Sequence, residues 1–82
     1  MLIGTLNVVT RPVTQRTAGP NGRRKLLTEV IVRMGGMPIA DRIIPGKWDV
    51  AAALAEFRKA PQRFIPRPHT GMTVETLKGI AA

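Results

Sequence analysis

The sequence has 82 residues, of which 13 are Lys or Arg and five are Asp or Glu, so its formal net charge is +8. That length suits one small domain, and we expect residues 1–82 to form it. The chain has no cysteine, serine or tyrosine, and His69 is its single histidine. These absences exclude a disulfide scaffold, thiolate chemistry and a serine or tyrosine nucleophile. We therefore expect a protein that is not an enzyme and that needs no metal ion or cofactor.

The positive charge is concentrated near the N-terminal end. Residues 1–25 carry five cations and no acid, whereas residues 26–60 carry five cations and four acids. A surface with this excess attracts polyanions, of which nucleic acid is the commonest in a cell. Nine of the 13 cations are arginine, whose planar guanidinium suits bidentate contacts to phosphate. The alternative is a solvated basic surface that only keeps the protein in solution.

Apolar runs in the sequence are short. The longest covers residues 50–55, far below the ~18 residues that a membrane-spanning helix needs. The opening residues 1–9 are interrupted by Gly4, Thr5 and Asn7 and follow no basic region, so they do not resemble a signal peptide. We expect no membrane partner and a cytoplasmic location.

The first part of the chain, residues 1–46, has a β-rich pattern. A first strand is expected over residues 2–9. Arg11 and Pro12 are expected to form its end or a bulge, because proline cannot donate to a ladder. Alternatively, residues 13–15 continue the strand. Residues 16–24 read RTAGPNGRR. This cluster of turn-forming residues predicts the exposed tip of a basic hairpin.

A second hairpin is predicted around Gly35 and Gly36. Residues 26–34 have the apolar content of a strand, and two glycines suit a turn in which both positions need positive φ. A two-residue turn sets the register, so that Val32 faces Ile39 and Glu29 faces Arg42. The face expected to enter the core contains Leu26, Val30, Val32, Met34, Met37, Ile39 and Ile43. Pro38 is then expected where the third strand forms a sheet edge.

The second part of the chain, residues 47–82, has a helix-like pattern. Asp49 is a predicted N-cap for a helix whose apolar residues recur at i, i+3, i+4 and i+7, and Pro61 ends that helix. Residues 61–69 contain three prolines and predict an extended arm. Thr73 is a predicted cap for a short helix from residue 74 to about residue 81.

The predicted fold is α+β: a three-stranded antiparallel β-meander with one packed helix, an extended arm and a short C-terminal helix. Such a core is thin, and it leaves the edge strand, the arm and the last helix in need of cover. We therefore expect a homodimer, formed by exchange of the arms or by edge pairing. A monomer whose arm folds back over the sheet is the alternative.

The basic hairpin tip is the first candidate site. Arg16, Asn21, Arg23, Arg24 and Lys25 place four cations around one projecting loop. Such a loop can grip a nucleic-acid backbone through charge and through accessible amides. A solvated polar turn is the alternative. Outside the loop, Arg11 would extend the track of phosphate contacts.

The arm is the second candidate site. Arg63, Phe64, Arg67 and His69 alternate basic and stackable groups, a mixture that single-strand binders use. Alternatively, Phe64 and Ile65 anchor the arm in the core. Single-stranded DNA or RNA is somewhat preferred as the partner, because no basic recognition helix is visible in the sequence.

These observations favour a non-enzymatic nucleic-acid-binding protein. The alternative is a small phage or mobile-element modulator that binds a host protein through the third-strand edge or the arm. Over residues 13–50, the basic hairpin, the Gly-Gly turn and the following Ile-Ile-Pro-Gly are loosely similar to the small single-stranded-DNA-binding proteins of filamentous phages. The helical second half departs from that family, and the tyrosines usual in it are missing.

Overall fold

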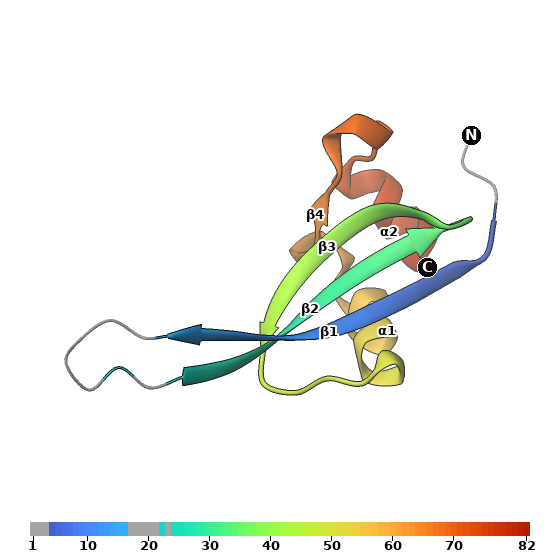
Figure 1. Ribbon diagram of the computed structural model, residues 1–82. Coiled ribbons are helices and arrows are strands. Elements are labelled where there is room, and N and C mark those ends of the chain that lie inside the picture. The colour runs from blue at the N-terminus through green and yellow to red at the C-terminus, as the bar shows by residue number, and fades with distance from the viewer. Residues whose placement is uncertain (1–3, 17–21, 23) are drawn as a thin grey trace.

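The computed structural model describes residues 4–16, 22 and 24–82 (Figure 1). The elements in chain order are β1 (Leu6–Arg16), β2 (Arg24–Met34), β3 (Met37–Pro45), α1 (Val50–Lys59), the 3₁₀ turn η1 (Pro61–Arg63), β4 (Ile65–Pro66), the 3₁₀ turn η2 (Pro68–Thr70) and α2 (Val74–Ala81). The strands form one antiparallel sheet in the order β1-β2-β3-β4. The α+β class is as predicted, but the sheet has four strands rather than three because part of the arm pairs with β3.

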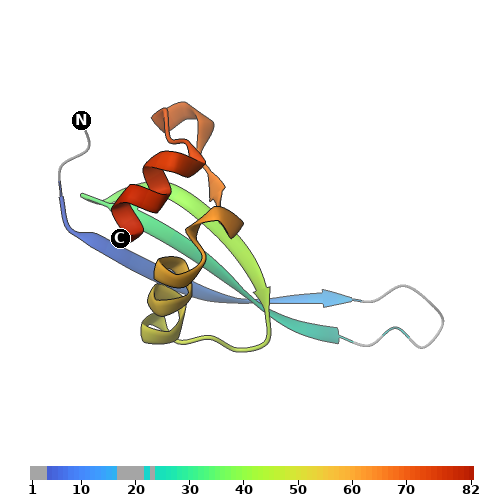
Figure 2. The same ribbon diagram turned by 180° about the vertical axis from the view of Figure 1, so that it is seen from behind.

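Both helices lie against the same face of the sheet. The sheet is in front of α1 and α2 in Figure 1, and the helices are in front of the sheet in Figure 2. The core between these layers consists of Val8, Val30, Val32, Ile39, Ala40, Ile44, Ala53, Phe57, Phe64, Leu77 and Ala81. None of the elements that the structure describes covers the opposite face.

The turn between β2 and β3 has the predicted conformation. Gly35 and Gly36 have φ values of 59° and 83°, so both positions use the freedom that only glycine has without strain. The chain before β1 packs closely against this turn. The Gly35 amide donates to the Thr5 carbonyl at 3.3 Å, and a Cβ added at Gly4 would collide with the Gly35 backbone.

Beyond the turn, the predicted register is wrong by one residue. Arg33 pairs with Pro38 but Val32 pairs with Ala40, so the strand has a β-bulge and Ile39 is the extra residue. From there on the faces of β3 are exchanged relative to the prediction, because side chains alternate along a strand. Glu29 therefore faces Ile43 rather than Arg42.

The bulge also changes which side chains are buried. Ile44 is 4% exposed, whereas Ile43, which was predicted to lie in the core, is 55% exposed. Leu26 and Met37, both from the same predicted core face, are each 44% exposed. The core is therefore centred on Val30, Val32 and Ile39 and extends to the helices rather than along the whole hairpin.

The first strand does not end at Pro12. Pro12 pairs with Thr28 in the middle of β1, so the predicted end or bulge at Arg11 and Pro12 is wrong. Among the described strands β1 has only β2 as a neighbour, and an edge strand tolerates a residue that has no N–H group.

The two helices begin and end as the sequence predicts. Asp49 Oδ1 accepts the Ala52 amide at 2.7 Å, and Thr73 Oγ1 accepts the Thr76 amide at 3.2 Å. Each bond satisfies a donor that has no partner inside the helix. Helix α1 ends at Lys59, shortly before Pro61. Within the described part of the chain, neither helix has the length and apolar character needed to cross a membrane.

The arm folds back onto the sheet of its own chain. In β4, Ile65 and Pro66 pair with Asp41 and Ala40, and the Arg67 amide donates to the Ile39 carbonyl at 2.9 Å. At Ala40 and Asp41 β3 is therefore covered by β4, whereas at Pro38, where the edge was predicted, none of the described strands pairs with β3 on that side. The arm therefore has the arrangement expected for the monomeric alternative, in which it folds back over the sheet. It is also not extended along its whole length, because it contains η1, β4 and η2.

Candidate nucleic-acid interface

One end of the sheet narrows to two strands. The last pair between β2 and β3 joins Leu27 to Pro45, whereas β1 and β2 stay paired as far as Arg16 and Arg24. We call residues 14–16 and 24–26, which lie beyond that last pair, the ribbon. It extends away from both helices in Figures 1 and 2. A group near its end can therefore approach a large ligand without obstruction by the helical layer.

A buried hydroxyl fixes the base of the ribbon. Thr28 is 3% exposed, donates to the Gly46 carbonyl at 2.7 Å and accepts the Trp48 amide at 3.1 Å. These bonds attach the loop between β3 and α1 to β2 at the position where the third strand ends. The sequence analysis did not identify Thr28, because its partners are 18 and 20 residues away and no local pattern points to them.

The ribbon carries two of the predicted site residues in an accessible position. Arg24 and Lys25 are exposed at the start of β2. For Arg16 the structure describes the backbone, which pairs with Arg24. Asn21 and Arg23 lie outside the described residues.

Every acidic side chain of the protein is already engaged. The salt bridges are Arg11–Glu29 (3.0 Å), Arg42–Glu56 (3.1 Å), Arg67–Asp41 (2.7 Å) and Lys78–Glu75 (3.4 Å). The fifth acid, Asp49, caps α1. No acid is therefore left to neutralise the remaining cations, which carry the net positive charge.

Five of the seven remaining cations with described side chains form two groups, and Arg33 and Lys47 belong to neither. Among the described side chains, those with no carboxylate within 4.0 Å are Arg24, Lys25, Arg33, Lys47, Arg58, Lys59 and Arg63. Arg24 and Lys25 form the ribbon pair. Arg58, Lys59 and Arg63 follow one another around the end of α1 and form the helix-end cluster, which is also exposed.

Of the nucleic-acid contacts predicted on the arm at Arg63, Phe64 and Arg67, only Arg63 is both exposed and without an acidic partner. Phe64 is 2% exposed and packs edge-to-face on Phe57 at 5.1 Å between ring centroids. Its ring is not accessible for stacking on a base, so Phe64 anchors the arm as the alternative predicted. Ile65, the second anchor in that alternative, is instead 65% exposed. Arg63 is exposed, but Arg67 is held by Asp41. Arg11 likewise has Glu29 as a partner, although its side chain is 69% exposed.

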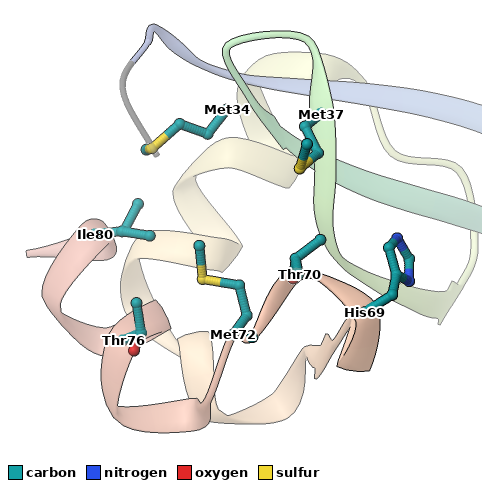
Figure 3. Close-up of a pocket in the computed structure, with 8 residues that line it drawn as sticks. Met34, Met37, His69, Thr70, Met72, Thr76 and Ile80 are labelled. Carbon is teal, nitrogen blue, oxygen red and sulfur yellow. The ribbon is translucent and has the colours of Figure 1, made fainter. Parts of the chain in front are cut away.

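A pocket of about 560 Å³ lies near the opposite end of β2, beside the Gly-Gly turn (Figure 3). Its lining comes from separate segments: Met34, Met37, His69, Thr70, Gly71, Met72, Thr76 and Ile80. None of the described residues that line it is Lys or Arg, so the pocket is poorly suited to phosphate. Among the described residues, no three His, Asp or Glu side chains come together as metal ligands.

Comparisons of the chain with protein-family models, with curated proteins and with solved structures found no match.

Proposed function

We propose that this protein binds nucleic acid without catalysing a reaction, and that the ribbon provides its principal phosphate contacts. The observation that carries the proposal is the separation of charge. All five acids are engaged in the sheet and helices, whereas Arg24 and Lys25 have no acidic partner and are exposed on the ribbon. Unneutralised cations on a narrow projection favour contact with a polyanion.

Single-stranded DNA or RNA is the preferred ligand in this proposal. In α1 the basic residues are confined to the last turn, and in α2 Lys78 is paired with Glu75. Neither described helix therefore offers a basic face for the major groove. Because Phe57 and Phe64 are both buried, stacking on phenylalanine contributes little and backbone contacts dominate the affinity.

The host-protein alternative keeps only part of its predicted docking edge. Strand addition at the free edge of β3 was one route to such a partner, but β4 already pairs with β3 at Ala40 and Asp41. The other route, through the arm, meets the same obstacle because the arm contains β4. This observation favours the nucleic-acid proposal over strand addition by a host protein.

The test is a salt titration of binding by fluorescence anisotropy, with single- and double-stranded DNA and RNA oligonucleotides. If Arg16, Arg23, Arg24 and Lys25 neutralise about four phosphates of a single strand, log K falls with log salt at a slope of roughly −2.8. Replacing Arg24 and Lys25 with alanine should make that slope shallower by roughly 1.4. No binding, or binding that is independent of salt, would contradict the proposal.

A matched control distinguishes the effect of where the cations lie from the effect of the lower net charge. The variant in which Arg58 and Lys59 are replaced with alanine loses the same two charges from the helix-end cluster. We expect it to retain a salt slope close to that of the unmodified protein. Equal losses in the two double variants would indicate a diffuse attraction to the whole basic surface instead of a site on the ribbon.

A further inference from the structure

The face of the sheet opposite the helices carries exposed apolar side chains. Directly opposed residues of antiparallel strands share a face, which places two rows side by side: Val9, Ile31, Asp41 and Ile65, and then Arg11, Glu29 and Ile43. We call these two rows the open face. Val9, Ile43 and Ile65 on it are 40%, 55% and 65% exposed. A solvated sheet face normally presents polar side chains at such positions.

The two rows of the open face neutralise their own charges, while Arg33, which alternates onto the same face and has no carboxylate within 4.0 Å, adds a positive charge at the margin next to the Gly-Gly turn. The two acids of the face hold arginines, in the pairs Arg11–Glu29 and Arg67–Asp41. Arg63 lies at one margin, where it lines a hollow of about 590 Å³ together with Ile43 and Ile65. The centre of the face is therefore apolar and neutral, in a protein whose net charge is +8.

We propose that the open face is the surface through which two copies of this chain associate. Two copies that each carry +8 repel one another at long range. The repulsion is weakest where each copy neutralises its own cations, and burial of Val9, Ile43 and Ile65 then supplies the favourable free energy. This inference does not rest on the proposed nucleic-acid binding.

The other surfaces predicted for a dimer are less suitable. The arm is paired with β3 of its own chain. The outer edge of β1 contains Pro12, which offers no N–H group to a second strand. Antiparallel pairing of two β1 strands about their centre would also place Arg11 opposite Arg11 of the second copy, and directly opposed like charges are destabilising.

The test is sedimentation velocity over a wide range of protein concentration, on the unmodified chain and on the variants Ile43→Lys and Ile65→Lys. Each variant adds one cation per copy to the open face at a position that is already exposed, so the fold should persist, and circular dichroism checks this. We expect the unmodified chain to form dimers and each variant to dimerise roughly tenfold more weakly or not at all, because like charges then meet across the interface.

Leu26→Lys is the matched control, because Leu26 is a 44% exposed strand residue whose side chain alternates onto the other face. It should dimerise like the unmodified chain. Three results would overturn the proposal: an unmodified chain that is monomeric at every concentration, open-face variants that dimerise normally, or a control that loses dimerisation as well.

The salt dependence of dimerisation provides a second readout. Added salt should change dimerisation and nucleic-acid affinity in opposite directions. Added salt screens the repulsion between two like-charged copies, so dimerisation through the open face should become stronger. Nucleic-acid binding should become weaker under the same conditions. A dimer that dissociates as salt is added would show that ion pairs between the copies hold it, and would overturn the apolar interface.

Discussion

The two ends of the β1–β2 hairpin have the same backbone pairing but opposite surroundings. Near the Gly-Gly turn, the opposed residues Val8 and Val32 are 6% and 0% exposed because the helices cover them. On the ribbon, the opposed residues Gln15 and Lys25 are both exposed. Hydrogen bonding between strands is thus common to both ends, and the difference between them comes from what packs on the sheet.

This contrast separates the source of stability from the proposed source of binding. A two-stranded ribbon alone is marginally stable in water, so the free energy of unfolding comes mainly from the part of the sheet that the helices cover. Substitutions there should alter stability, whereas substitutions on the ribbon should alter affinity. The predictions that follow test this division.

The largest effect is expected in the helix-covered core. Phe57 is fully buried and contacts Phe64 edge-to-face, so Phe57→Ala should lower the free energy of unfolding by about 3–5 kcal/mol. That cost approaches the total stability of many small domains. Urea denaturation followed by circular dichroism measures it, with Phe57→Leu as the milder control. A loss below about 1 kcal/mol would show that the core is not the main source of stability.

The next effect is expected at the base of the ribbon. Thr28→Val keeps the size of the side chain but removes the hydroxyl that bonds Gly46 and Trp48. Leaving these partly buried groups without partners should cost about 1–3 kcal/mol in the same urea experiment. Thr28→Ser retains the hydroxyl and should recover part of that loss. If the serine variant is less stable than the valine variant, packing and not hydrogen bonding determines the effect.

A smaller effect is expected from a partly buried salt bridge. The side chains of Arg42 and Glu56 are 19% and 17% exposed, and Arg42 also lies over the Phe64 ring at 5.6 Å. Glu56→Gln leaves this guanidinium without its carboxylate and should cost about 1–2 kcal/mol. Glu75→Gln breaks the exposed pair with Lys78 and should cost less than about 0.5 kcal/mol. Thermal unfolding of both variants makes the comparison, and equal losses would contradict it.

The smallest effect on stability is expected on the ribbon itself. Replacing Arg24 and Lys25 with alanine should change the free energy of unfolding by no more than about 0.5 kcal/mol, because both side chains are exposed and unpaired with acids. The same variant is the one expected to have the shallower salt slope. A destabilisation above about 1 kcal/mol would show that the ribbon and the core are coupled.

Local chemistry was enough to predict the turn and the helix ends. Gly35 and Gly36 specify the tight turn through their positive φ values, and Asp49 and Thr73 begin their helices through side-chain bonds to amides three residues later. Each of these signals acts within a few residues. The structure therefore confirms the second hairpin, α1 and α2.

The β-bulge and the fourth strand could not be predicted in the same way. Ile43 and Ile44 are adjacent and identical, so hydrophobic patterning is compatible with either face of β3 in the core, and packing around Ile39 decides between them. The place of Phe64 beside Phe57 and under Arg42 likewise depends on contacts between distant segments. For the candidate site, the sequence identified the excess of cations but not which arginines are held by acids.

The absence of packing on the ribbon has a consequence for how such a protein can be altered. Since no described helix or third strand lies against residues 14–16 and 24–26, and the Gly46 amide reaches only as far as the Leu26 carbonyl, the interior places no limit on how far the hairpin reaches. Lengthening each strand by one residue would move the tip outward by about 3.3 Å and leave the interior unchanged. The same fold could therefore hold its cations at several distances from the helix-covered part of the sheet, or carry a grafted peptide in place of the cations.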